Sequence, residues 1–329
     1  MAEAAPRLIL AADVGGTKTD VGVFAAGDPP SMVRSARYLS RDYAGLDELI
    51  ADFIGSERIE AAGVAAAGPV LGEEIRPTNL AWVISAGRIA SDLGGAPVCL
   101  LNDLEVAATG VLGLDASGLR RLHPGVARDA HRAILAPGTG LGQGLLLRVQ
   151  DGYRPSASEG GHVGFSPRDE EQIELLRFLR ARYAQVSLEH ILSGSGLANI
   201  FDFVDGELGV EVADSVRKRL SPEDRGAVIG EAAVAGDCPA SAHSVALFAR
   251  VLAARAGDLA LSLLALGGIY IGGGMMPKLL TVIDAAEFCD VFVGHGPFAP
   301  LLAKIPVDVV IEPKVALLGA AAAASRRLQ

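Results

Sequence analysis

A carboxylate and an imidazole stand three residues apart in Glu159-Gly160-Gly161-His162, with two glycines between them. Glycines remove side-chain bulk where a ligand must come close to the backbone. Glu159 offers acceptor oxygens and His162 offers a donor or an acceptor, a combination that suits neighbouring hydroxyl groups on a sugar ring. A tight turn with two solvated side chains is an equally good interpretation, so this stretch does not decide the function by itself.

A second glycine-rich stretch, Asp13-Val14-Gly15-Gly16-Thr17, lies between two short apolar runs that predict strands at 8–12 and 20–24. No helical pattern follows the glycines, whereas a Rossmann turn or a P-loop places its glycines at the start of a helix. In a hairpin, backbone N–H groups of Gly15 and Gly16 can face an anion, Thr17 adds a hydroxyl donor, and Asp13 can hold hydrated Mg²⁺. A plain hairpin turn explains the stretch as well.

Asn102 and Asp103 follow a strand predicted at 97–101. The carboxyl ends of strands are where open α/β sheets bind ligands. Both residue types are also favoured N-caps, and capping of the helix expected from 104 to 112 is the simpler role for at least one of them.

Three further segments carry glycine turns. Pro137 to Gly142 joins two apolar runs and repeats the first hairpin, which suggests two related halves. Glu189 precedes a glycine turn and a helix start, and a surface role is its default interpretation. Gly272-Gly273-Gly274 follows a strand, where backbone alone can line a flat purine or ribose.

The remaining elements outline two domains, as 329 residues allow. Glycine, Asp, Ser and Pro accumulate over 113–125, where the apolar period lapses, and this predicts a domain boundary. A helix is predicted to begin with Ser166 as N-cap and Pro167 in the first position. Alanine-rich helices are predicted over 240–266 and 316–326.

Composition excludes several classes of protein. The net charge is −10 and no large basic cluster is present, which argues against nucleic acid or an anionic membrane as the main partner. The three cysteines are too far apart for a zinc motif or a disulfide framework, which favours a reducing cytoplasm. The uncharged stretch 259–277 is interrupted by glycines, and residues 1–6 do not read as the start of a signal peptide. We therefore expect a soluble cytoplasmic protein.

Taken in order along the chain, these motifs resemble those of bacterial ATP-dependent glucokinases, in the zinc-free group of the hexokinase/actin-like ATPase superfamily. Thr78-Asn79 ahead of Trp82 also fits. The resemblance implies an α/β protein with a two-domain actin-like ATPase (ribonuclease H-like) fold and a sugar/ATP cleft between the domains. It places residues 1–113 and 312–329 in a small α/β domain and 114–311 in a large one.

The resemblance also implies a function and a role for each motif. Asp103 is similar to the catalytic base that accepts the proton of the glucose C6 hydroxyl as ATP donates its γ-phosphate, the first step of glycolysis. The sugar ligands implied are Asn102, Asp103, Glu159, His162 and Glu189. The ATP-binding residues implied are Ala12, Asp13, Val14, Gly15, Gly16, Thr17, Gly138, Thr139, Gly140, Gly272, Gly273 and Gly274. Mg²⁺ near Asp13 and a homodimer are implied in the same way.

Two positions depart from the family pattern: Ala12 stands where glycine is usual, and Gly164 where an acidic residue is usual. The related repressor/open-reading-frame/kinase sugar kinases carry a cysteine-rich zinc motif, and no cysteine lies between Cys99 and Cys238. The alternatives are a kinase of mannose or N-acetylglucosamine, a polyphosphate-dependent glucokinase, a sugar sensor without turnover, and an actin-like filament protein.

Overall fold

The computed structural model describes residues 6–77, 80–221 and 224–328. The chain forms two compact units. Unit 1 comprises residues up to Ser117 together with those from Glu312 onward, and unit 2 comprises Gly118–Ile311. The division expected from the sequence lay after residue 113 and before residue 312.

Unit 1 is built on a mixed sheet with the strand order β3-β2-β1-β4-β8. The strands are β1 (Leu8–Val14), β2 (Lys18–Ala25), β3 (Ser31–Leu39), β4 (Ala61–Ala66) and β8 (Val98–Asn102). The first three are antiparallel, whereas β4 and β8 run parallel to β1. A small separate sheet contains β5 (Val70–Leu71), β6 (Glu74–Ile75) and β7 (Ile84–Ser85).

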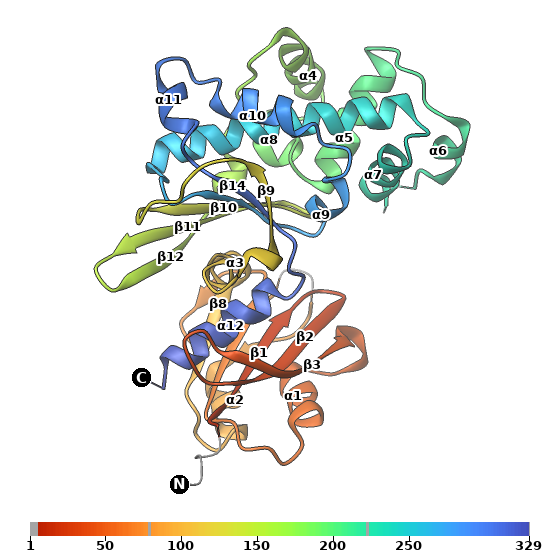
Figure 1. Ribbon diagram of the computed structural model, residues 1–329. Coiled ribbons are helices and arrows are strands. Elements are labelled where there is room, and N and C mark those ends of the chain that lie inside the picture. Colours follow the sequence, from red (N-terminus) through yellow and green to blue (C-terminus); the bar gives the residue numbers. More distant parts are fainter. Residues whose placement is uncertain (1–5, 78–79, 222–223, 329) are drawn as a thin grey trace. The chain divides into compact units, whose positions relative to one another are not determined.

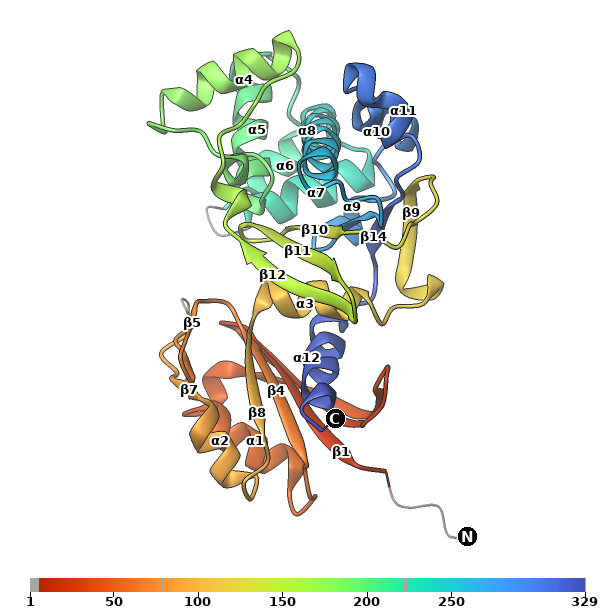
Figure 2. The same cartoon turned by 90° about the vertical axis from the view of Figure 1, so that its left-hand side faces the viewer.

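Helices cover both faces of this sheet (Figure 2). Leu10 and Val14 of β1 pack with α1 (Leu46–Ile54) and α2 (Ala86–Asp92) on one face. Ile9 and Ala11 pack with α3 (Asp103–Val111) and α12 (Val315–Arg326) on the other. Successive side chains of β1 point to opposite faces of the sheet, and because both faces are covered by helices, both sets of side chains are apolar and buried. Two short 3-10 helices, η1 (Ser40–Asp42) and η2 (Ala116–Gly118), complete the unit.

The terminal helix α12 approaches its neighbours very closely. A Cβ atom on Gly63 of β4 would overlap the carbonyl oxygen of Ala320, and one on Gly319 would overlap that of Val106 in α3. Glycine at these positions lets the backbones touch, so α12 is an integral part of the core of unit 1.

Unit 2 repeats the strand pattern of unit 1. Its sheet has the order β12-β11-β10-β13-β14-β9. The strands are β9 (Leu119–His123), β10 (Arg132–Pro137), β11 (Leu141–Val149), β12 (Gly152–Ser158), β13 (Ile269–Ile271) and β14 (Val307–Val310). As in unit 1, three antiparallel strands adjoin two parallel ones. The shared topology agrees with the two related halves inferred from the paired hairpins.

Figure 1 shows α5, α7, α8 and α10 on one face of this sheet. The helices of unit 2 are α4 (Glu170–Arg180), α5 (Gly194–Gly206), α6 (Asp214–Arg219), α7 (Arg225–Ala235), α8 (Pro239–Leu263), α9 (Met276–Leu279), α10 (Ala285–Val293) and α11 (Ala299–Leu302). Phe201, Phe248 and Phe292 fill the core between them. Short 3-10 helices are η3 (Gly160–His162), η4 (Leu188–His190) and η5 (Gly296–Phe298). No helix among the described residues is both long and apolar enough to cross a bilayer.

The stretch 113–125, where the apolar period lapses, contains the division between the two units and also strand β9, which is paired with β14 far along the chain. One prediction of local structure is wrong. Helix α4 begins at Glu170 with Asp169 as its N-cap, and not after Ser166. The Asp169 carboxylate accepts from Gln172 N at 2.8 Å, while Phe165 N is bonded to Val186 O, which keeps the preceding residues extended.

Candidate functional site

The carboxyl ends of three neighbouring strands bring the predicted residues of unit 1 together. Asp13 lies beside Ala65 in the register of β1 and β4, and Ala66 lies beside Asn102 in that of β4 and β8. Because the three strands are parallel, Asp13 and Asn102 lie at the same edge of the sheet. This is the edge at which α/β sheets bind ligands.

The first glycine turn is a hairpin without a following helix, as predicted. Gly15 N donates to Lys18 O at 3.0 Å, and a Cβ on Gly15 would lie 2.7 Å from that oxygen. The buried residue Ser40 supports the turn: its hydroxyl donates to Gly15 O at 2.8 Å, and its N–H donates to Thr17 O at 3.0 Å. Gly16 and Thr17 are exposed at the tip. The turn is therefore rigid and open to a ligand.

Behind this turn, the carboxylates of Asp20 and Asp103 lie near that of Asp13. Burial, together with the charges of Asp20 and Asp103, raises the pKa of Asp13 to about 6, although Arg37 opposes the shift. Arg37 itself is engaged by Asp20 through two hydrogen bonds of 2.8 Å. A divalent cation would relieve this repulsion. Mg²⁺ usually takes one or two carboxylates and completes its shell with water and phosphate oxygens, so Asp13 fits such a site.

Elsewhere the described residues offer no alternative metal site. Over the described ranges, no three His, Cys, Asp or Glu side chains are grouped so that they would hold a metal ion by themselves.

Asn102 caps helix α3, as one of the two interpretations predicted. Its Oδ1 accepts from Leu104 N at 2.9 Å, and its Nδ2 donates to Gly68 O at 3.2 Å. Asp103 is the first residue of α3. The positive end of the helix dipole favours a carboxylate at this position. The cap thus fixes the helix end that carries the expected catalytic base.

The second glycine turn, in unit 2, is held by Glu189. The Glu189 carboxylate accepts from Leu141 N at 2.9 Å, and a Cβ on Gly140 would lie 2.5 Å from it. Within the turn, Gly138 N donates to Gly140 O at 2.8 Å. The Glu189 side chain is half-buried against the turn, unlike the surface residue that an isolated glutamate would be by default.

Glu159 and His162 also lie in unit 2, in a segment that packs against Leu141 at the start of β11. Glu159 precedes η3 and His162 is its last residue, and a Cβ on Gly161 between them would overlap the carbonyl oxygen of Leu141. The segment that follows pairs with the one ahead of Glu189, through Leu188 N to Val163 O at 2.9 Å. Both side chains point into solvent: Glu159 is 94% exposed and His162 63%, with 3.9 Å between carboxylate and imidazole. Their tight glycine spacing therefore serves backbone packing.

The third glycine loop packs on the second turn. Gly273 has φ +84°, and a Cβ there would overlap the carbonyl oxygen of Pro137. Gly272 N donates to Leu135 O at 2.7 Å. The loop and the turn 138–140 are thus neighbours in unit 2, as expected if one binds the nucleoside and the other its phosphates.

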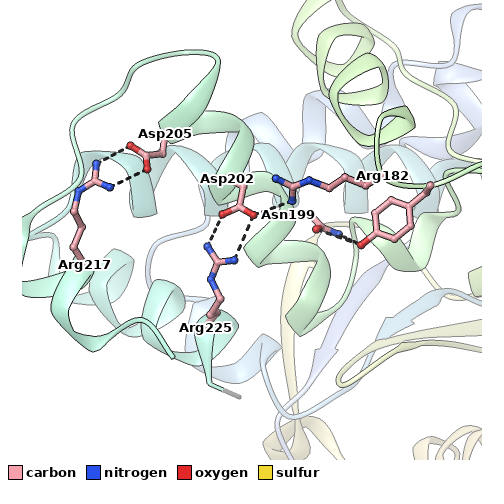
Figure 3. Close-up of polar contacts among 7 residues, drawn as sticks. Arg182, Asn199, Asp202, Asp205, Arg217 and Arg225 are labelled. Carbon is pink, nitrogen blue, oxygen red and sulfur yellow. Dashed lines mark hydrogen bonds and ion pairs between the residues drawn. The ribbon is translucent and has the colours of Figure 1, made fainter. Parts of the chain in front are cut away.

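Helix α5 adds its N-terminus to this group. Gly194 N donates to Gly138 O at 2.8 Å, and Ser193 caps the helix by accepting from Gly196 N. Figure 3 shows how α5 is anchored: Asp202 accepts hydrogen bonds from Arg182 and Arg225. Burial raises the pKa of Asp202, but these hydrogen bonds outweigh it and hold the pKa below its usual value.

Neighbouring contacts show that His190 is structural, as predicted. Figure 3 also shows Asn199 bonded to a tyrosine, Tyr183, and that ring stacks on His190 at 3.9 Å between centroids. Asn199 Nδ2 donates to His190 O at 2.9 Å. These contacts fix the short helix η4, and with it Glu189.

The structure thus collects the predicted residues into two groups, one per unit. Asp13–Thr17, Asn102 and Asp103 lie at one sheet edge in unit 1. The turn 138–140, the loop 272–274, Glu159, His162 and Glu189 lie around the start of β11 in unit 2. Thr78 and Asn79 lie outside the described residues. Sequence reasoning missed Asp20 and Ser40 behind the first turn. Asp20 had a signal, since it is an acid on an otherwise apolar strand.

The fold can be compared with solved structures. Two α/β units of shared topology, each with a glycine-turn hairpin, form the two-domain actin-like ATPase fold. The chain is similar to a glucokinase from an Antarctic psychrotroph, with a TM-score of 0.86 and 27% identity over 97% of this chain and 99% of that one. A ROK family glucokinase from Streptomyces griseus, solved with glucose and AMPPNP, has the same fold, with a TM-score of 0.64 and 23% identity over 97% and 99%.

The sequence comparisons are more specific. The glucokinase family model matches residues 10–327. The glucokinase of Trichormus variabilis is 36% identical over 97% of this chain and 99% of that protein. The chain belongs to the glucokinase family.

Proposed function

We propose that the protein is an ATP-dependent glucokinase, which transfers the γ-phosphoryl group of ATP to the C6 hydroxyl of glucose. The observation that carries this proposal is the match of the glucokinase family model to residues 10–327 of the chain. Both glycine turns, the capped acid Asp103 and the Glu159–His162 stretch are all present and braced by named contacts. A sugar sensor would not need the acid or the phosphate turns.

Asp103 is proposed to act as the general base. It begins helix α3, and the Asn102 cap fixes its direction. Phosphoryl transfer depends mainly on positioning and on neutralising charge, with proton transfer to the base late in the reaction. General base assistance contributes typically about 10²–10⁴-fold. The carboxylate of Asp103 is therefore expected to affect turnover far more than glucose affinity.

The remaining residues are proposed to bind the two substrates. Asn102, Glu159, His162 and Glu189 bind ring hydroxyls of glucose, to which carboxylates offer acceptors and the imidazole a donor or an acceptor. The backbone of residues 12–17 and 138–140 binds phosphate, and residues 272–274 line the adenosine. Mg²⁺, held by Asp13 through water, would neutralise the phosphate charge. We also propose, by analogy with the family, a cytoplasmic homodimer.

A sugar-panel phosphorylation assay with Mg·ATP, run on the parent protein and Asp103→Asn, tests the proposal. We expect glucose 6-phosphate from the parent, a loss of kcat of about 10²–10⁴-fold in the variant, and glucose binding that changes by less than about threefold. Faster phosphorylation of mannose or N-acetylglucosamine, or turnover with polyphosphate alone, would replace the proposed substrate. Glucose binding without turnover on any donor would favour the sensor.

A further inference from the structure

A buried amide lies beneath the Glu159–His162 stretch. Gln143 is only 6% exposed on β11, between residues that are otherwise glycine and leucine. Its side chain occupies the space that a Cβ on Gly160 would need. The amide is therefore in van der Waals contact with the backbone of the proposed sugar-binding stretch, although it is shielded from solvent.

Hydrogen bonds connect this amide to the stretch. Gln143 lies opposite Ser158 in the register of β11 and β12, and its Nε2 donates to Ser158 Oγ at 3.1 Å. The same hydroxyl oxygen accepts from Gly160 N at 3.1 Å. Ser158 is the last residue of β12, so this pair of hydrogen bonds fixes the direction in which the chain leaves the strand and enters η3.

Arg255 of α8 determines which way the amide faces. Its guanidinium donates to Gln143 Oε1 at 2.6 Å. Arginine has donors only, so the amide must present its oxygen to Arg255 and its NH₂ group to Ser158. Arg255 Nε is buried and has no hydrogen-bond partner within the described part of the chain. The bond to Gln143 is thus a principal polar contact of this guanidinium.

The exposed side chains depend on this support. Glu159 and His162 are 94% and 63% exposed, so little packing of their own directs them. Their placement follows the backbone of η3, which is held by Gly160 N and by the contacts of Gly160 and Gly161 with β11.

We propose that Gln143 and Arg255 are positioning residues that set the affinity for the sugar, by holding Glu159 and His162 through Ser158 and Gly160. This inference rests on the proposed function, in which those two side chains bind glucose. The hydrogen bonds of Gln143 lead through Ser158 to the proposed sugar-binding stretch, so the effect is expected on glucose binding and not on ATP binding.

The main test is Gln143→Leu, which keeps the side-chain size but neither accepts from Arg255 nor donates to Ser158. A lost charge-assisted hydrogen bond that leaves its buried partner unpaired changes an equilibrium by about tenfold or more. We expect glucose KM and the calorimetric glucose Kd to rise about tenfold, with ATP KM within about twofold of the parent. Gln143→Glu can accept from both Arg255 and the Ser158 hydroxyl, and is expected to keep the parental glucose KM.

Two matched controls separate positioning from general destabilisation. Gln172 is an equally buried amide, 2% exposed, bonded within the start of α4. Gln172→Leu is expected to lower Tm without a change in glucose KM. Arg250 lies on α8 like Arg255, and its buried Nε also makes no hydrogen bond to the described residues, but its guanidinium bonds Glu171. Arg255→Met is expected to raise glucose KM several-fold, whereas Arg250→Met leaves it unchanged.

If Gln143→Leu does not fold, Ser158→Ala tests the positioning role instead, because this substitution removes only one hydroxyl group. It is expected to raise glucose KM several-fold, and the double variant with Gln143→Leu is expected to be no worse than the stronger single one, since both break one chain of contacts. Unchanged glucose KM in Ser158→Ala and Gln143→Leu, or an equal rise in glucose and ATP KM, overturns the positioning role alone. A parent that neither binds nor phosphorylates glucose overturns the proposed function as well.

Discussion

The two glycine turns have the same backbone setting and different chemistry. Each joins an antiparallel pair whose first strand continues the sheet through parallel neighbours. At the first turn, burial and the nearby charges of Asp20 and Asp103 raise the pKa of Asp13 to about 6. At the second, Glu189 is bound to Leu141 N and closes the turn. A repeated fold element thus carries an acid with a raised pKa in one unit and uses an acid as a brace in the other.

The largest expected effect concerns the acid of the first turn. Asp13→Asn removes the carboxylate proposed to hold Mg²⁺, and we expect kcat/KM for Mg·ATP to fall by about 10²–10³-fold, the usual cost of one group that stabilises transition-state charge. Higher Mg²⁺ should restore part of the activity. Asp52→Asn, a carboxylate of the same unit bonded to Tyr43, serves as the control. An Asp13→Asn enzyme with parental kinetics would remove the metal role from this turn.

The same substitution is expected to stabilise the metal-free protein, in a pH-dependent way. Because the pKa of Asp13 rises from its ordinary 3.8 to about 6 on folding, its ionised form opposes folding above pH 6. This cost shrinks as the pH falls through about 6 and disappears only below about pH 3, where Asp13 is protonated in both the folded and the unfolded state. Asp13→Asn should therefore gain up to about 3 kcal/mol at pH 8 and almost nothing at about pH 3. Unfolding in EDTA at both pH values measures it, and an equal gain at the two would contradict the assignment.

At the second turn, hydrogen bonding and not charge is expected to govern stability. Glu189→Ala leaves Leu141 N without its acceptor and should cost about 1–3 kcal/mol, seen as a lower Tm. Glu189→Gln keeps an acceptor and should unfold close to the parental Tm. If the two variants lose equal stability, the carboxylate charge matters here too, and the contrast between the turns is weaker than the geometry indicates.

The smallest effect is expected behind the second turn, at Asp202 of α5. Its pKa lies below the ordinary value, so the stability it provides is present at neutral pH and is lost as the pH falls through the lowered pKa. Asp202→Asn should cost about 1 kcal/mol at pH 7, and the difference from the parent should vanish in acid. Thermal unfolding from pH 7 to pH 3 gives the profile. A difference that persists in acid would assign the effect to packing.

Local signals explain what the sequence predicted well. The first hairpin and the cap at Asn102 both rest on residues within a few positions of one another. The start of α4 was wrong because Ser166, Pro167 and Asp169 all suit a helix start, and the pairing of Phe165 with Val186 decides among them. Nothing near 166 in the sequence reveals that pairing.

The features that the sequence did not predict depend on long-range contacts. Strand β9 was missed because its partner β14 lies almost two hundred residues later, as shown by the Arg121–Asp308 bond at a separation of 187. The role of Glu189 depends on a turn 48 residues earlier, and that of Gln143 on an arginine 112 residues later. A buried glutamine on an apolar strand was a usable signal for a polar network, but its partners could not be read from the chain.

The close packing of α12 in unit 1 has a consequence for the order in which the protein folds during synthesis. Residues 118–311 form a continuous stretch and can complete their core while the ribosome is still at work. The first strands to emerge wait longer, because α12, which packs against Gly63 on one face of their sheet, comes from residues 315–326. The unit whose synthesis begins first is therefore completed last, and until α12 is in place only α3 covers that apolar face, so that part of it is open to chaperones.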